Sequence, residues 1–148
     1  MKVRQPWATA LVSGQKDVEN RTWRLKSTSP WVLIAASKPP PTRAMLDEYR
    51  DRLRRHYGVP AQEPDEYVVS HILGLVKIAV YSPEELPWPS VWHNPPDLAW
   101  VVEDAWEFET PVPLHADDSF QIQVKLEHRA QYRAAVAAEI RKLRAAPR

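Results

Sequence analysis

The pattern of apolar and polar positions predicts several short strands interrupted by two long helices. Continuous apolar runs at residues 31–37 and 70–81 are short and rich in large side chains, which favours strands covered on both faces. Residues 98–108 and 119–127 are predicted as further strands, and the second alternates regularly between apolar and polar residues. One face of that last strand is therefore expected to contact water. Gly74, inside the longest run, predicts a bend or a close approach of two backbones.

Apolar residues at helical spacing predict the two long helices. The first begins near Thr42, which is placed to cap it, and carries an apolar stripe of Leu46, Tyr49, Leu53 and Tyr57. Arginines at positions 43, 50, 52, 54 and 55 occupy its remaining surface. Together with Lys38 they form either a solvated face or a surface that follows phosphates. The second helix covers about 128–146, with a stripe of Tyr132, Val136, Ile140 and Leu143. We expect that stripe to pack on the sheet, and a helix that binds a protein partner is the alternative.

A short helix and an unusually charged strand are predicted near the start. The helix has Pro6 at its first position and ends at Gly14. In the strand, residues 16–23, a period of two puts Asp17, Glu19, Arg21 and Trp23 on one face. Lys16 has the wrong parity for this face and joins it only if the chain is still turning after Gly14 or is bulged. Both signs of charge beside an indole predict an exposed edge or a site.

The elements together predict an α+β fold: a small mixed β-barrel of five or six strands with helical insertions and a C-terminal helix. The segment 83–97 holds five prolines and two tryptophans, cannot be regular, and is either a packed lid or a binding loop. The length of 148 residues fits one domain over 1–148, with a core of about 3–127 and the C-terminal helix after it.

Composition narrows the chemistry. The chain has no cysteine, which excludes disulfides, cysteine-ligated zinc and thiol catalysis. Its five histidines show no ligand spacing, so we expect neither a metal nor a cofactor. The formal net charge is only +1, so any binding of nucleic acid is expected to be local. With no leader-like or membrane-spanning segment, we expect a soluble cytoplasmic protein that does not associate with membranes.

The segment QPWATALVSGQKDVENRTW, followed by WVLIAASK, resembles the ASCH (activating signal cointegrator homology) domain family. The family pattern is QPWA, then GxKxxExR, then an aromatic residue and an apolar strand that ends in a small, polar and basic turn. The resemblance extends over residues 3–127. It implies a barrel similar to the PUA fold, with a cleft where the short helix meets the GxKxxExR strand. It also implies a role with nucleic acid, because members are regarded as binders of RNA or DNA, while some similar small members act as amidohydrolases or ribonucleases.

The predicted partner is therefore nucleic acid, RNA or DNA. In the pocket, Arg21 offers a planar fork, Lys16 a point charge, and Glu19 a group that orients Arg21 or accepts from an exocyclic amine. Trp7, Trp23 or Trp92 are candidates to stack a base. The full set of expected nucleic-acid-binding residues is Gln5, Trp7, Lys16, Glu19, Arg21, Trp23, Ser37, Lys38 and Trp92. The structural alternative is an exposed Glu19–Arg21 ion pair with tryptophans that only fill the core.

Two other functions stay open at this point. If the protein is an enzyme, Lys16, Glu19 and Arg21 are the expected catalytic residues of a metal-free ribonuclease or a nucleoside amide hydrolase. The amidohydrolases that this family resemblance suggests have a threonine three residues after the lysine, where this sequence has Glu19. Ser37 could replace that hydroxyl only within hydrogen-bond reach of Lys16. The other alternative is a protein-interaction adaptor that uses the terminal helix and residues 83–97.

Overall fold

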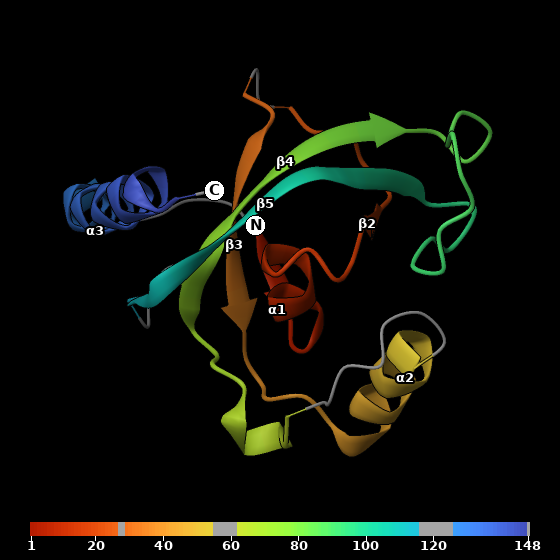
Figure 1. Ribbon diagram of the computed structural model, residues 1–148, viewed down its shortest axis with the longest axis horizontal. Helices are drawn as coiled ribbons and strands as arrows, with labels where there is room; N and C mark the ends of the chain where they lie inside the picture. Colours follow the sequence, from red (N-terminus) through yellow and green to blue (C-terminus); the bar gives the residue numbers. More distant parts are fainter. Residues whose placement is uncertain (27–28, 55–61, 116–125, 148) are drawn as a thin grey trace.

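A five-stranded mixed sheet forms the centre of the fold (Figure 1). The computed structural model describes residues 1–26, 29–54, 62–115 and 126–147. The strands are β1 (Lys2–Arg4), β2 (Val18–Arg21), β3 (Trp31–Ser37), β4 (His71–Tyr81) and β5 (Leu98–Pro113), arranged in the order β1-β3-β4-β5-β2. β1 pairs with β3 in parallel, and the other neighbours are antiparallel. The sheet curves into a half-barrel, which confirms the predicted α+β class.

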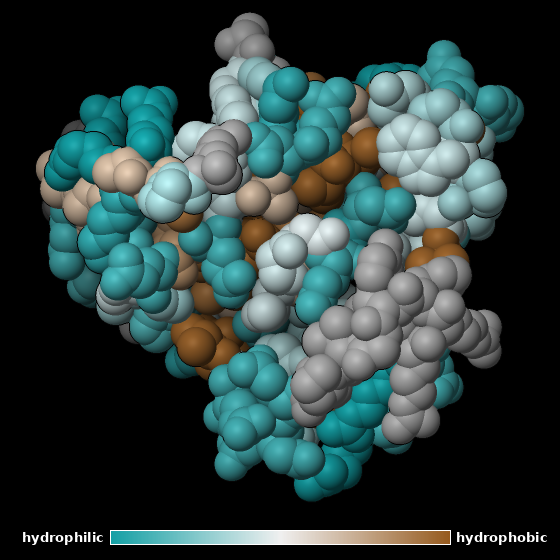
Figure 2. Space-filling view, in the orientation of Figure 1, coloured by the Kyte–Doolittle hydropathy of each residue, from teal (hydrophilic) through white to brown (hydrophobic). Residues whose placement is uncertain are grey.

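The helices lie on both sides of this curved sheet. Helix α1 (Trp7–Val12) sits within the curve, and α3 (Leu126–Ala145) packs on the outside (Figure 1). Helix α2 (Arg43–Arg54) and the short 3₁₀ helix η1 (Pro64–Glu66) connect β3 to β4. None of the described helices combines the length and the apolar character needed to cross a membrane. On the face drawn in Figure 2, hydrophobic side chains show only in small separate areas among hydrophilic ones.

Both faces of the sheet are buried, as the continuous apolar runs predict. In β3, Ile34 and Ala36 pack with α1, whereas Ala35 points to the other face and packs with residues of α3. Each of the three is 0% exposed. Consecutive side chains of a strand point to opposite faces, so this one apolar run contributes residues to the hydrophobic cores on both sides of the sheet.

Gly74 marks the place where β4 and β5 approach too closely for any side chain. A Cβ atom at this position would lie 2.1 Å from the main-chain oxygen of Trp106. The pairing of β4 with β5 shifts register between Ile72 and Gly74. The predicted close approach of backbones is confirmed, and it coincides with a bulge that curves the sheet.

The apolar stripe of the terminal helix packs on the sheet, as expected. Tyr132 and Val136 are buried against β5 and neighbouring strands, and Ile140 and Leu143 pack beside them. The side chain of Glu139 accepts a hydrogen bond from the Thr110 amide at 3.2 Å, which ties the helix to β5. This stripe is therefore used within the chain, and the fold lends no support to a partner-binding role for it.

Several element boundaries differ from the sequence expectation. β2 has four residues rather than the predicted eight, because the chain is still turning before Val18 and bends again directly after Arg21. β5 continues to Pro113 instead of ending at 108, because its added residues pair with the start of β4, where His71 faces Pro113. The predicted strand 119–127 falls mostly on residues 116–125, which lie outside the described residues. Its last two positions belong to α3, which begins at Leu126.

Candidate functional site

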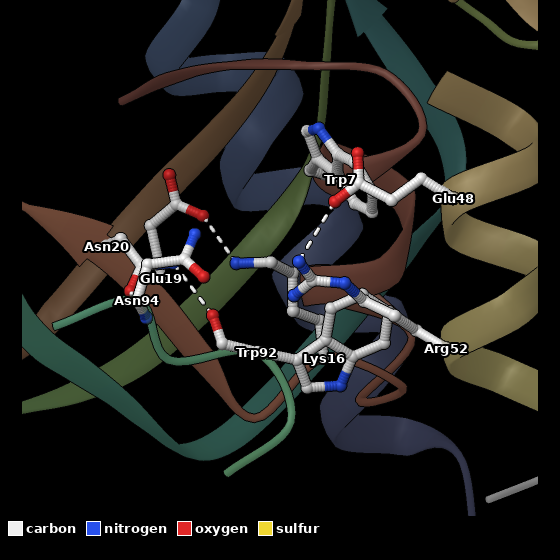
Figure 3. A pocket seen from close by; sticks show the side chains of 8 residues that line it. All are labelled: Trp7, Lys16, Glu19, Asn20, Glu48, Arg52, Trp92 and Asn94. Carbon is white, nitrogen blue, oxygen red and sulfur yellow. Dashed lines mark hydrogen bonds and ion pairs between the residues drawn. The ribbon is translucent and has the colours of Figure 1, made fainter. Parts of the chain in front are cut away.

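A cavity of about 240 Å³ opens where α1, β2, α2 and the segment before β5 meet (Figure 3). We call it the aromatic cavity. Its lining residues are Trp7, Lys16, Glu19, Asn20, Glu48, Arg52, Trp92 and Asn94. Ligand pockets commonly measure about 300–1,000 Å³. The aromatic cavity is therefore sized for a single ring system rather than an extended ligand.

The turn after α1 brings Lys16 into this cavity. Gly14 has a φ of +78°, a conformation that costs glycine little, and its amide donates to the Leu11 carbonyl at 3.2 Å. The Lys16 amide then donates to the Ala10 carbonyl at 2.9 Å, before β2 begins at Val18. The chain is thus still turning at Lys16, which resolves the parity conflict in favour of the turn rather than a bulge.

Lys16, Glu19 and Arg21 form a continuous chain of charges. The Lys16 ammonium donates to Glu19 Oε2 at 2.7 Å and also to the main-chain carbonyl of Val18. Arg21 Nη2 lies 2.9 Å from the other oxygen, Glu19 Oε1. The Lys16 and Glu19 side chains are only 6% and 11% exposed. Burial lowers the pKa of Lys16, and the adjacent Glu19 carboxylate opposes that shift. The Glu19 carboxylate thus bridges two cations at a position that is largely shielded from solvent.

Arg21 supports the cavity from behind and does not line it. Its Nη2 also donates to the main-chain carbonyl of Lys2 in β1 at 3.4 Å. β1 and β2 are the two edges of the sheet, so this side chain connects the edges across the half-barrel. Arg21 Nε is buried without a hydrogen-bond partner among the described residues. The guanidinium therefore orients Glu19 and holds the curved sheet together.

Aromatic side chains and one arginine build the opposite wall. The rings of Trp7 and Trp92 meet edge to face at 5.9 Å, and Tyr49 packs against Trp7 at 5.7 Å. The Arg52 guanidinium lies 5.4 Å from the centre of the Trp92 ring, donates to the Val91 carbonyl at 2.9 Å and pairs with Glu48 at 2.9 Å. Trp92 is 2% exposed, so Trp7 and Arg52 present most of this wall to a ligand.

Two asparagines complete the rim and were not identified from the sequence. Asn20 Nδ2 donates to the Trp92 carbonyl at 2.8 Å, and Asn20 Oδ1 accepts from the Asn94 amide at 2.7 Å. These bonds fix the segment 83–97 against β2, as does Asp17, which accepts from Trp88 Nε1 at 3.2 Å. The exposed side-chain amide of Asn94 has no hydrogen-bond partner among the described residues and remains available to a ligand.

The sequence also did not identify Arg52 and Glu48 as an ion pair that lines the cavity. On α2 they form an i,i+4 ion pair, a pattern that in sequence cannot be told from a solvated helix face. Two other arginines of α2, Arg43 and Arg50, also pair with carboxylates. Only contact with Val91 and Trp92 distinguishes Arg52 from them.

The remaining expected site residues lie elsewhere. Gln5 is 0% exposed, and its amide bonds to Thr9 and to the Val68 carbonyl, so it holds α1 in place. Trp23 is 45% exposed and meets Trp100 edge to face at 4.7 Å, and it does not line the aromatic cavity. Of the nine residues expected to bind nucleic acid, the structure brings together Trp7, Lys16, Glu19 and Trp92 in this cavity.

Ser37 and Lys38 line a second cavity of about 280 Å³, which we call the basic cavity. Its other lining residues are Lys2, Ala36, Ser70, Leu114 and His115. Ser37 therefore does not share a cavity with Lys16, and the structure does not provide it as a nucleophile beside that lysine. Among the described residues, no group of three or more histidine, aspartate or glutamate side chains is arranged to hold a metal ion.

Comparison with known proteins agrees with the motif and the fold. The family model described as "ASCH domain" matches residues 1–88, which is more than half of the chain. Human activating signal cointegrator 1 is 34% identical over 79 residues, which make up 53% of this chain and 13% of that protein. The chain thus corresponds to a small part of this relative. The match covers α1, the GxKxxExR segment and the first four strands, and on this ground the chain belongs to the ASCH domain family.

Proposed function

We propose that this chain binds RNA by receiving one unpaired base in the aromatic cavity. The ASCH family is generally thought to bind RNA, which gives the broad class of ligand. The observation that carries the finer assignment is the position of the buried Lys16–Glu19 pair in a cavity walled by Trp7 and Arg52. A wall of planar groups opposite a polar edge suits an unstacked base.

The balance of charge favours a base over a phosphate in this cavity. Two cations line it, Lys16 and Arg52, and each pairs with a carboxylate of the same lining, Glu19 and Glu48 respectively. The lining thus offers donors and acceptors without a net charge. A neutral heterocycle exchanges hydrogen bonds with such a lining, whereas a phosphate would meet two carboxylates.

Three side chains supply the groups that would read the edge of the base. The Lys16 ammonium has three N–H donors, of which two are used by Glu19 and the Val18 carbonyl. Each Glu19 oxygen keeps a lone pair beyond its ion pair, and the Asn94 amide can both donate and accept. Trp7 and the Arg52 guanidinium provide planar surfaces on which a base can stack.

Tryptophan fluorescence tests this proposal directly, since Trp7 and Trp92 line the cavity. The chain is titrated with single-stranded RNA, single-stranded DNA of the same sequence, and duplex RNA, each at two salt concentrations. We expect a saturable change with single strands and a weaker one with duplex, because a paired base must first leave its stack. Asn94→Ala should weaken binding, whereas Asn20→Ala would also disturb the 83–97 segment and is a poorer probe. Equal responses to single strands and duplex, or no response, would refute the proposal.

A second candidate function, hydrolysis of RNA or of an acylated nucleoside, has one observation in its favour. Burial lowers the pKa of Lys16, which increases the fraction of neutral amine able to accept a proton. Glu19, 2.7 Å away, works in the opposite direction by stabilising the ammonium. Product formed from RNA or an acylated nucleoside, and abolished by Lys16→Met while binding survives, would establish this activity.

A further inference from the structure

The basic cavity differs from the aromatic cavity in the side chains that line it. Its lining combines two lysines, Lys2 and Lys38, with the hydroxyls of Ser37 and Ser70, and the described lining holds no carboxylate. The segments come together at one end of the sheet, where β3 ends, β4 begins and β5 has just ended. We propose that this cavity binds a phosphate group.

Three of these side chains, those of Ser37, Ser70 and Lys38, have donors that are available to a ligand. Neither the Ser37 hydroxyl nor the Ser70 hydroxyl has a hydrogen-bond partner among the described residues, and Lys38 makes no ion pair with any of them. Neither hydroxyl is sealed from solvent, since the described side chains contain one buried polar atom without a partner, and that atom belongs to Arg21. Two hydroxyls and an ammonium that share one cavity of about 280 Å³ are the donor set that a phosphate oxygen accepts from.

The backbone holds these donors on a rigid frame. The Ser70 amide donates to the Ala36 carbonyl at 2.8 Å, and the Leu114 amide donates to the Ser70 carbonyl at 2.9 Å. Ser70 is thereby fixed between the end of β3 and the end of β5. Ser37 is the last residue of β3 and faces Arg4 across the parallel pair. The two hydroxyls are therefore positioned by sheet hydrogen bonds and not by a free loop.

The phosphate could belong to a nucleic-acid strand or to a small phosphate compound. One residue connects the two cavities, because Arg21 bonds Glu19 of the aromatic cavity and the Lys2 carbonyl beside the basic cavity. A strand that places one base in the aromatic cavity has backbone phosphates to offer nearby. Only this assignment to a strand rests on the proposed function, and the phosphate site itself does not.

Inorganic phosphate at constant ionic strength is the first probe. Amide chemical shifts of the ¹⁵N-labelled full chain should move in a saturable way at Ser37, Lys38 and Ser70. Lys38→Gln should weaken phosphate binding about fivefold, and Ser37→Ala should weaken it as well although the charge is unchanged. Lys26→Gln, which removes a charge from an exposed lysine outside both cavities, is the matched control and should have no effect.

The results of these titrations distinguish a specific phosphate site from a general attraction of phosphate to positive charge. Shifts spread over all lysines, or equal losses in Lys38→Gln and Lys26→Gln, would overturn the proposal. So would an unchanged affinity in Ser37→Ala, because a site without hydroxyl contacts is only a region of positive potential. Tryptophan fluorescence with RNA is recorded separately, so a failure of the aromatic cavity to bind RNA does not affect this result.

A second arm identifies the source of the phosphate. Single-stranded RNA in which one linkage at a time is a neutral methylphosphonate is titrated into the wild type and into Lys38→Gln. If the strand supplies the phosphate, one position of replacement weakens wild-type binding and has no further effect in Lys38→Gln. If every position is equivalent while inorganic phosphate still binds, the ligand is a small phosphate compound, and the site stands without the strand.

Discussion

Both cavities are lined by lysine, but among the described residues only the aromatic cavity also holds carboxylates. Lys16 and Lys38 both belong to the motif that identifies the family. Lys16 is buried against a carboxylate, whereas Lys38 is exposed and has no carboxylate partner in the part of the chain that the structure describes. Among the described residues, the lining of the aromatic cavity, about 240 Å³, holds two cations and two carboxylates, and the lining of the basic cavity, about 280 Å³, holds two lysines and no carboxylate. From this comparison we expect that the pairing of a lysine with a carboxylate, and not the number of lysines in a motif, decides which ligand chemistry a cavity favours.

Removal of Glu19 tests the pairing in the aromatic cavity and should have the largest effect. Glu19→Gln keeps the shape of the side chain but leaves the buried Lys16 ammonium without its counter-ion. Breaking a buried pair in this way costs about 3–5 kcal/mol of unfolding free energy. Glu48→Gln, which removes the 52% exposed partner of Arg52, should cost about 0–1 kcal/mol. Urea unfolding of both variants measures the difference, and similar losses would show that the Lys16–Glu19 pair is not a buried one.

Replacement of tryptophans tests which indole a ligand meets. Trp7→Leu should reduce the affinity for single-stranded RNA by about 1–3 kcal/mol, because it removes the more accessible ring of the cavity wall. Trp23→Leu, at a more exposed position outside both cavities, should leave the affinity unchanged. Affinities come from anisotropy of labelled RNA, and urea unfolding of each variant separates a lost contact from a damaged fold. Equal losses in the two variants would move the binding surface to the face that carries Trp23.

Local patterns predicted much of this fold. The bounds of β3 and nearly those of β4 follow from their apolar runs, because a strand buried on both faces has few polar positions. Gly74 predicted a close backbone approach, which the Trp106 oxygen confirms. The turn at Gly14 could be anticipated as one of two ways to reconcile Lys16 with the charged face of β2, but the sequence alone did not choose between them.

The composition of the cavities could not be predicted in the same way, because it depends on contacts distant in sequence. Asn94 reaches the site through a hydrogen bond to Asn20, 74 residues away, and reads in sequence as a turn residue among prolines. Arg52 looks like any solvated arginine of α2 until Trp92 is placed beneath it. Ser37 and Lys38 lie in a separate cavity because β1 and β3 are paired at the opposite edge of the sheet from β2.

The protonation of Lys16 gives a smaller and pH-dependent effect on stability. Burial lowers the pKa of Lys16 below the usual 10.5, so between its folded pKa and 10.5 the unfolded chain binds more protons than the folded one. The free energy of unfolding should therefore rise with pH in that window. Lys16→Met should remove the part of the rise above about pH 8, because the Met1 amino group, whose pKa burial lowers from 8.0 to about 5, contributes below that pH. Urea unfolding from pH 7 to 9.5 measures it, with Lys26→Met as the control.

The measurement ends at pH 9.5 because the ionisation of Tyr49 changes the stability in the opposite direction above that pH. Burial raises the pKa of the Tyr49 phenol, so the unfolded chain loses this proton first and stability should fall as the pH rises beyond 10. A flat stability profile below pH 9.5 in the wild type would mean that Glu19 fully compensates for the burial of Lys16.

The salt dependence of RNA binding gives the smallest effect and the sharpest contrast between the cavities. If Lys38 contacts a backbone phosphate, Lys38→Gln should lower the slope of log K against log salt by about 0.7 for a single strand. Asn94→Ala should instead weaken binding by the same factor at low and high salt, because the aromatic cavity releases no counter-ion when it takes a neutral base. Anisotropy titrations at four salt concentrations measure both slopes. A reduced slope in Asn94→Ala, with none in Lys38→Gln, would reverse the assignment and place the phosphate in the cavity whose charges are paired.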